Sequence, residues 1–334
     1  MQLKRGLRVL RRAADEVQVG TDPRWAVRIR GLTPDQAERL LAAGDRALDA
    51  SLPRPVLDGL AAAGLVRSPR ARPPRVAARL APELLAADLT SREGDGVDVL
   101  RRRAGATVAI AGLDRVGVAV ATALAASGVG ALLLDDPRAV RPGDVGGGVT
   151  AGHVGLRRDQ VVTELVRALA PSLRVRRPGQ ASPDVVVTVA AGATDPGTAL
   201  DLLGADVAHL PVVVREADAA VGPFVVPVAH SPAGAPLPCV RCVDLHRAAL
   251  DPAWPVLLAQ LTARDRPGRP AVTGPSSVLA AVAGALAAAE VLAHLDGHAP
   301  RTLGAQYEIP LPEAEPRLRR WAAHPDCGCA ALVT

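Results

Sequence analysis

The sequence TVAIAGLDRVGVAVATALAASGVGALLLDD, residues 107–136, has the order of an alternating α/β fold. Val108–Ala111 is a short apolar run that ends at Gly112. A longer run of small and aliphatic residues follows, and a second short apolar run, Ala131–Leu134, ends in Asp135. Strand, glycine turn, helix, strand and acid form the first unit of a nucleotide-binding sheet, in which the acid follows the turn by about 20 residues. We therefore predict a doubly wound α/β sheet that begins here.

The glycine loop carries the predicted nucleotide contacts, Gly112 and Gly117, and Asp135 is the expected ribose ligand. In the usual G-x-G-x-x-G pattern the middle glycine lets the backbone approach the phosphates, but Asp114 stands at that position. Its carboxylate would repel a phosphate, although Arg115 beside it could offset the charge. Two interpretations stay open: a nucleotide site, and a βαβ unit that keeps the fold without binding a nucleotide.

Length and charge narrow the classes of function. With 334 residues the chain is long enough for two domains, and a hydrophobic fraction of 49% is that of a soluble globular protein. The net charge of +5 comes from arginine, because Lys4 is the only lysine. The arginines are scattered among acids, and one Tyr and one Phe offer little aromatic surface to stack on bases. We therefore expect no nucleic-acid partner.

The first residues contain no apolar run long enough for a signal peptide, so we expect a cytoplasmic protein. Val278–Leu295 is apolar, but it is mostly alanine and contains Glu290 and His294. A membrane-spanning helix needs about 20 strongly apolar residues with few charges. We therefore predict a buried helix here and no membrane partner.

Residues 1–66 are predicted to form a small winged-helix-like domain. Three short segments in which polar and apolar residues partly alternate are strand candidates, namely Leu7–Leu10, Val17–Val19 and Trp25–Ile29. Thr33 and Gln36 have the spacing of a capping box at a helix start, and a second helix is expected over Pro55–Ala63. Such a domain can bind DNA, bind a peptide by strand addition, or only pack against its neighbour. We favour peptide binding, because the second helix offers DNA only Arg54.

Residues 67–98 are predicted to be a linker that is rich in proline and arginine over 67–75 and contains a short helix over Ala81–Leu89. Residues 99–334 are the predicted main domain. Beyond the glycine loop it alternates helix and strand candidates, namely Leu156–Ala170, Asp184–Ala190, Asp195–Asp206 and Pro211–Val214. This alternation supports a Rossmann-like, doubly wound sheet.

All four cysteines belong to two closely spaced pairs, Cys239 with Cys242 and Cys327 with Cys329. In a chain without an export signal, two such pairs indicate four thiolate ligands around a structural zinc ion. Gly328 allows the tight bend that the second pair requires. Free thiols and a redox-active C-x-x-C pair are the alternatives.

Together these features resemble the ThiF/MoeB/HesA superfamily, which is similar to ubiquitin-activating enzymes. The resemblance covers residues 100–330: the glycine loop, the acid after the second strand, the cysteine pairs, and a long apolar helix over Ser276–Leu295. It is closest to the subgroup that accompanies azoline-forming cyclodehydratases in ribosomal peptide biosynthesis, whose members carry an N-terminal winged-helix-like peptide clasp. VGPFVVP at Val221–Pro227 and HPDCGC at His324–Cys329 carry this closer resemblance.

The resemblance implies a site that uses ATP and magnesium to adenylate a C-terminal carboxylate. The positions that match this site are Gly112, Gly117 and Asp135, with Arg158 near the position of its lysine. The Asn/Arg pair of such a site falls in Asp144–Gly148, where no arginine stands, and its magnesium-binding Asp falls near Ala191. Because adenylation depends on positioned cations and a metal carboxylate, these differences all weaken the site.

We therefore predict a degenerate member of this superfamily: a zinc-stabilised scaffold that presents a peptide to a separate enzyme similar to the YcaO cyclodehydratases. The main alternative is an active adenylyltransferase that acts on the C-terminus of a small carrier protein, with ATP and magnesium as cofactors. A nicotinamide oxidoreductase is a third class, supported only by the glycine loop. No catalytic residue is predicted, because His153, His209 and His230 lie singly in apolar or Pro/Gly surroundings. A homodimer stays open.

Overall fold

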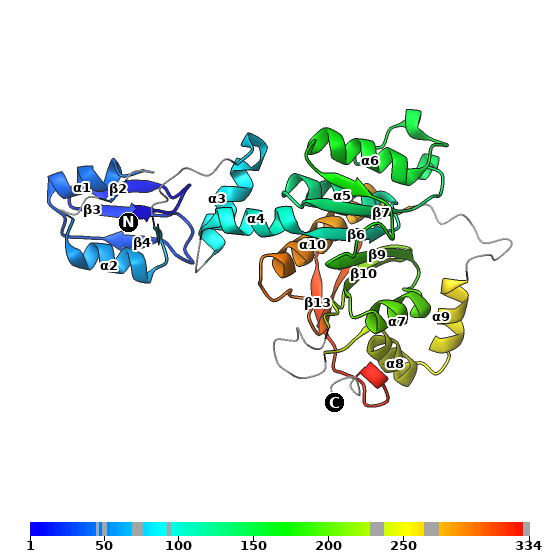
Figure 1. The fold of residues 1–334 in the computed structure, drawn as a ribbon. Helices are drawn as coiled ribbons and strands as arrows, with labels where there is room; N and C mark the ends of the chain where they lie inside the picture. The colour runs from blue at the N-terminus through cyan, green and yellow to red at the C-terminus, as the bar shows by residue number, and fades with distance from the viewer. Residues whose placement is uncertain are drawn as a thin grey trace. The chain divides into compact units, whose positions relative to one another are not determined.

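A computed structural model (Figure 1) describes residues 1–44, 47–48, 52–68, 76–91, 95–227, 237–263 and 274–329. The chain divides into two compact units, Met1–Arg101 and Arg102–Thr334. Most of the predicted 67–75 connector, and His230, lie outside the described residues.

The N-terminal unit contains two small antiparallel sheets and two helices around one apolar core. Its strands and helices are β1 (Gln2–Leu3), β2 (Val9–Ala13), β3 (Glu16–Val19), β4 (Val27–Ile29), α1 (Pro34–Leu41), α2 (Arg54–Ala62) and β5 (Val66–Arg67). β1 pairs with β5, and β2, β3 and β4 form a three-stranded sheet in that order. This arrangement of strands and two helices is the winged-helix-like pattern that the sequence predicts.

The first helix begins where the capping box predicts. Thr33 Oγ1 accepts the Gln36 N–H at 3.2 Å, and Gln36 Oε1 accepts the Thr33 N–H at 3.0 Å. These two bonds satisfy N–H groups that the helix itself leaves without partners. Ala37 and Leu40 then lie on the face that is buried in the core.

The N-terminal unit also includes η1 (Ala78–Leu80), α3 (Ala81–Thr90) and the beginning of α4 (Gly96–Gly105). Arg5, just after β1, is 2.7 Å from Asp88 and 2.9 Å from Asp95, and Lys4 Nζ donates to the Ser91 carbonyl. These side chains attach α3 and the segment after it to β1. α3 lies where the sequence predicts a short helix within the linker, and α4 begins at Gly96, before the predicted start of the main domain. The separability of residues 1–66 stays a prediction.

The larger unit is built on an 8-stranded sheet. From one edge to the other its strands are β13 (Arg317–Arg320), β12 (Ala305–Pro310), β11 (Asp218–Val221), β10 (Ala208–Val214), β9 (Val185–Ala191), β6 (Thr107–Ala111), β7 (Ala131–Asp135) and β8 (Arg174–Arg176). The strands from β10 to β8 are parallel, and β11, β12 and β13 add antiparallel strands beyond β10. The parallel part has the 3-2-1-4-5 strand order of a doubly wound fold, which confirms the predicted Rossmann-like sheet.

Helices complete the larger unit. They are α5 (Arg115–Ala126), α6 (Arg158–Leu169), α7 (Pro196–Gly204), α8 (Val240–Leu250), α9 (Trp254–Thr262) and α10 (Ser277–Leu295), with the short turns η2 (Pro142–Asp144) and η3 (Ala151–His153). α5 packs against both α6 and α10, whereas α8 contacts both α7 and α9 (Figure 1).

By length and composition α10 could cross a membrane. In this fold it packs along α5 and β11, and Leu279, Ala283 and Val291 are buried. Gly284 permits the close approach, because a Cβ there would lie 2.5 Å from the Ala119 Cβ. The apolar run thus forms a core helix, as the sequence predicts.

Candidate functional site: the glycine loop and the cysteine cluster

The glycine loop follows β6, the strand that lies between β7 and β9. This is the point where the strand order of a doubly wound sheet reverses and ligands usually bind. Gly112 has φ +95°, and a Cβ there would lie 2.4 Å from the Val189 carbonyl oxygen. A Cβ on Gly117 would lie 2.1 Å from the Gly112 carbonyl oxygen. Backbone packing therefore requires both glycines, whether or not a nucleotide binds.

Asp114 is the N-cap of α5. Its Oδ1 accepts the N–H of Val116 at 2.8 Å and of Gly117 at 3.2 Å. These are among the amides that a phosphate at a helix N-terminus would use. Burial raises the pKa of Asp114, and the two backbone hydrogen bonds only partly oppose that rise. The residue that the sequence marked as a repulsive charge is thus the loop's own capping group.

A buried ion-pair cluster lies beside the loop. Asp136 is 2% exposed, and it accepts the Leu113 N–H at 2.9 Å, Arg138 Nε at 2.7 Å and Arg158 Nη1 at 3.1 Å. Arg158 also donates to Asp144 at 2.6 and 3.1 Å. Burial opposes ionisation of Asp136, but the hydrogen bonds from Arg138 and the Leu113 N–H outweigh it and hold its pKa below the usual range.

The predicted cofactor-binding residues therefore have different surroundings. Arg158 is buried and paired with two carboxylates, whereas the side chain of Asp135 is exposed at the end of β7. The Asp135 carbonyl oxygen accepts the Gly112 N–H at 3.1 Å. Successive side chains along a strand point to opposite faces of the sheet, so the Asp135 side chain is exposed while that of Asp136 is buried. Sequence reasoning missed Asp136 and Asp144; the adjacent pair of aspartates was the only signal for the first.

Arg115 also has partners in the structure. Its Nη2 donates to the Val145 carbonyl at 2.6 Å and its Nη1 to the Pro275 carbonyl at 3.1 Å. Its buried Nε has no hydrogen-bond partner among the described residues. The guanidinium thus connects the segment after β7 to the start of α10.

The end of β9 is the place where the superfamily resemblance locates a magnesium carboxylate. Ala191 is exposed there. The nearest acid along the chain, Asp195, caps α7 by accepting the Thr198 N–H at 2.9 Å and its hydroxyl at 2.7 Å. Its carboxylate is therefore used to start a helix.

The four cysteines lie together and are buried. Their Sγ atoms all lie within 4.8 Å of one another. Individual separations are 3.9 Å for Cys239 and Cys242, 3.6 Å for Cys239 and Cys327, and 3.4 Å for Cys242 and Cys329. A tetrahedral zinc ion with Zn–S bonds of about 2.3 Å would place its sulfur atoms about 3.8 Å apart. The cluster therefore has the dimensions of a four-thiolate metal site.

Local structure brings the two cysteine pairs together. Cys239 is the N-cap of α8 and Cys242 lies in its first turn, while Cys327 follows β13 in a turn closed by its N–H to the His324 carbonyl at 2.9 Å. The hydrogen bond with Cys242 raises the pKa of Cys239 to about 12, and contacts with Cys239 and Cys242 raise that of Cys329. Hydrogen bonds with Cys239 and Cys329 lower the pKa of Cys242, so one thiol of the cluster ionises most readily and its neighbours resist ionising with it.

Solved structures share this fold. E. coli MccB with succinimide has a TM-score of 0.71 and 16% sequence identity, covering 99% of this chain and 98% of MccB. E. coli MccB with ATP has a TM-score of 0.69 and 16% identity, covering 98% of this chain and 99% of MccB. PaaA has a TM-score of 0.69 and 14% identity, covering 95% of this chain and 99% of PaaA. No family model matches the chain, and no curated protein matches it.

At these identities the likeness is one of fold. It covers 99% of this chain and therefore extends over both units. The chain therefore has, over nearly its whole length, the fold of MccB and PaaA, which confirms the fold that its ThiF-like motifs predict.

Proposed function

We propose that this chain is a peptide-binding scaffold that does not adenylate, and that it presents a peptide to a separate enzyme of the YcaO cyclodehydratase type. The observation that carries the proposal is that the glycine loop is already occupied by the chain's own groups. Asp114 holds the first amides of α5, and Arg158 is paired with Asp136 and Asp144. A triphosphate would need those amides and a cation that is free to bind it.

The energies involved favour the occupied state. A phosphate charge about 4 Å from the Asp114 carboxylate costs on the order of 4 kcal/mol at an effective dielectric of about 20. One additional hydrogen bond returns only about 1 kcal/mol. Recruiting Arg158 for the triphosphate would leave two carboxylates buried without their cation, which costs several kcal/mol more.

The peptide-binding part of the proposal rests on the N-terminal unit. β2 is at an edge of its three-stranded sheet, and Leu10 on it is 41% exposed. An exposed edge strand can accept an extended peptide as one more strand. MccB, a microcin C7 biosynthetic enzyme, has been solved in complex with N-formylated MccA. The YcaO-type partner is inferred from the VGPFVVP and HPDCGC motifs, and a cytoplasmic location from the sequence.

The cysteine cluster is proposed to hold a structural zinc ion through Cys239, Cys242, Cys327 and Cys329. The sulfur separations fit a tetrahedral ion. With four thiolate ligands, zinc has no open position for a substrate or water, so its contribution is to the stability of the fold.

The test is nucleotide binding and turnover by the purified chain. We expect no ATP–pyrophosphate exchange with short peptides that end in a free carboxylate, and weak or undetectable MgATP binding by calorimetry. An Asp114→Gly variant frees the first amides of α5, so it should bind MgATP more tightly than the parent chain. Asp195→Ala is the matched control, because it removes a helix cap without changing the glycine loop.

Robust pyrophosphate exchange by the unmodified chain would falsify the scaffold proposal. It would favour the second candidate, an adenylyltransferase acting on a small carrier protein or peptide. That candidate is supported by the MccB structure with ATP.

A further inference from the structure

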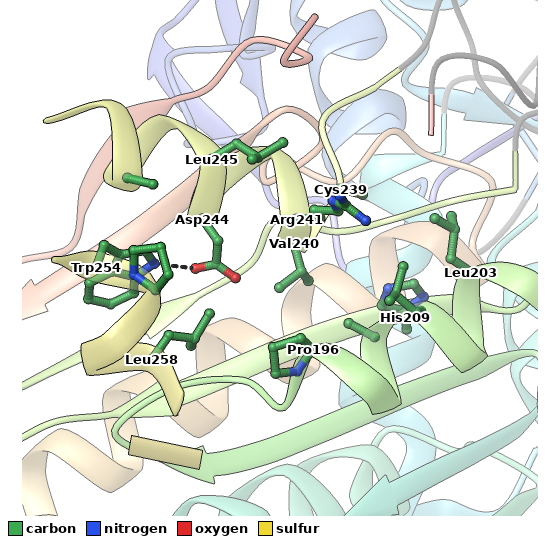
Figure 2. A pocket seen from close by; sticks show the side chains of 14 residues that line it. Pro196, Leu203, His209, Cys239, Val240, Arg241, Asp244, Leu245, Trp254 and Leu258 are labelled. Atoms are coloured by element: carbon green, nitrogen blue, oxygen red, sulfur yellow. Dashed lines mark hydrogen bonds between the residues drawn. The ribbon is translucent and has the colours of Figure 1, made fainter. Parts of the chain in front are cut away.

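A cavity of about 240 Å³ lies between α7, α8 and α9 (Figure 2). Its walls include Leu203 from α7, Val240 and Leu245 from α8, and Trp254 and Leu258 from α9. Nearly all of the lining is apolar. Apart from Cys239 at its edge, the cavity shares no residue with the glycine loop or the cysteine cluster.

α9 leaves this space open. It is rich in large apolar residues, yet none of its residues is buried. Trp254 and Leu258 are only half-buried on the side that lines the cavity, while Val256 is 63% exposed elsewhere on the helix. An apolar, largely preformed hollow with a few polar groups is the usual form of a small-ligand site.

Two acceptors lie in the lining on different sides of the cavity (Figure 2). His209 is 3% exposed, and its Nδ1 lies 2.9 Å from the Val207 carbonyl oxygen. A carbonyl only accepts, so Nδ1 carries the proton and Nε2 presents a lone pair. Burial lowers the pKa of His209, which keeps the ring neutral.

Asp244 is the second acceptor. One carboxylate oxygen, Oδ1, accepts the Trp254 indole N–H at 3.1 Å and lies 3.7 Å from Arg247 Nη1. Both of these contacts use Oδ1, and Figure 2 shows the carboxylate directed into the space between Trp254 and Val240. A ligand donor near Oδ2 would therefore meet an acceptor that already has a fixed orientation.

We infer that this cavity binds an aromatic group of about the size of indole that carries one hydrogen-bond donor. An apolar cavity of about 150 Å³ is large enough for benzene, so about 240 Å³ leaves room for a second fused ring. The apolar walls contact the ring faces, and Trp254 offers an aromatic partner. Arg241 also lines the cavity and only donates, but it is exposed, whereas the acceptors His209 and Asp244 lie deeper in the lining. A donor on the ligand would pair with one of these acceptors, and it distinguishes this ligand from a plain hydrocarbon.

The test uses indole and benzothiophene as probes, since benzothiophene has nearly the same shape and no N–H. We expect calorimetry and ligand-observed NMR to give indole a Kd of about 1 mM or tighter, and benzothiophene a value about tenfold weaker. Asp244→Asn presents an amide that can keep the Trp254 bond while turning a donor toward the ligand, so it should remove the preference for indole.

A cavity-filling variant provides the control for location. Ala248→Phe on α8 places a ring in the cavity and should abolish indole binding, whereas Ala249→Phe adds the same ring at an exposed neighbour and should leave it unchanged. Circular dichroism should be the same for both variants. No indole binding at 10 mM probe, or equal binding by both variants, would overturn the inference. The experiment is independent of ATP and of the peptide, so its failure leaves the proposed function untouched.

The natural source of the ring is resolved by a second probe, N-acetyltryptophanamide. Binding at least as tight as that of indole identifies a tryptophan side chain of a peptide as the ligand. Indole binding without N-acetyltryptophanamide binding identifies a free small molecule. Either result supports the site, whereas binding of N-acetyltryptophanamide that survives Ala248→Phe places the contact elsewhere and contradicts it.

Discussion

The glycine loop and the cysteine cluster both bury ionisable groups, and they differ in how the charge of those groups is balanced. In the loop, amides of α5 meet Asp114, and Arg158 joins Asp136 to Asp144. In the cluster, the described side chains that hydrogen-bond the four thiols are the thiols themselves, and backbone groups of His324 and Cys239 also hydrogen-bond Cys242. A region that balances its own charge is stable without a ligand, whereas a region that does not needs an ion. The comparison therefore favours the cysteines as the place for an ion, and it supports the proposal that the loop binds no nucleotide.

The largest expected effect is the loss of the ion from the cluster. Cys242→Ser, or exposure to a strong chelator, should remove one zinc per chain and lower Tm by roughly 10 °C or more, because structural zinc contributes several kcal/mol to folding. Metal analysis and differential scanning calorimetry measure the two changes. Asp326 directly precedes Cys327, and its side chain is 84% exposed. Asp326→Asn is therefore the control and should shift Tm by less than about 2 °C.

If the purified chain contains no stoichiometric metal, or if Cys242→Ser keeps the Tm of the parent, the cysteine cluster does not depend on an ion and the contrast with the glycine loop is wrong. In the chelator experiment, adding zinc back should restore Tm. Recovery with zinc but not with magnesium would sharpen the assignment, since thiolates prefer the softer ion.

The next effect concerns the loop. Arg158→Met removes the cation between Asp136 and Asp144 and should destabilise the chain by about 3–5 kcal/mol, because it leaves buried carboxylates without their partner. Arg157→Met is the matched control, since Arg157 is 52% exposed and pairs with Asp159 at the surface. That change should cost no more than about 1 kcal/mol. Urea unfolding of the three proteins gives the comparison, and equal losses would show that the buried cluster is not special.

The smallest effect depends on pH. The pKa of Asp114 is raised above its ordinary 3.8, chiefly by burial. The folded chain thus binds this proton more tightly than the unfolded chain, so stability declines as pH rises from 3.8 through the folded pKa. Asp114→Asn keeps a capping oxygen and does not titrate. It should be more stable than the parent at pH 7, by no more than about 1 kcal/mol, and should lose that advantage at pH 3.

Urea unfolding across this pH range tests the sign. If the stability difference between Asp114→Asn and the parent stays constant with pH, burial does not raise the pKa of Asp114 in the folded chain. A parent that becomes the more stable protein at pH 7 would mean that attraction to Arg158 outweighs burial.

Short motifs that shape a turn, cap a helix or bind a metal could be predicted from the sequence. The turn at Gly112, the capping box at Thr33 and both cysteine pairs are where the sequence places them, because each depends on residues only a few positions apart. The parallel strands were also predictable, since buried strands such as β7 are continuous apolar runs.

The missed features depend on distant partners or lack a pattern. Asp144 becomes a site residue only because the segment after β7 returns to α6 and places Arg158 beside it. β13 carries a single apolar residue, Leu318, so it has no alternation to detect. α9 has no buried face, and α4 begins at a glycine that resembles a loop residue. Tertiary contacts define these elements, and local sequence does not encode them.

The close approach of backbone at Gly112 and Gly117 has a consequence for how such sequences evolve. Any larger side chain at either position would collide with a carbonyl oxygen of the fold itself. Selection for a folded chain alone would then retain both glycines after a nucleotide had ceased to bind. A glycine signature can thus outlive the activity for which it is usually taken as evidence, and the residues between the glycines are the better record of which activity remains.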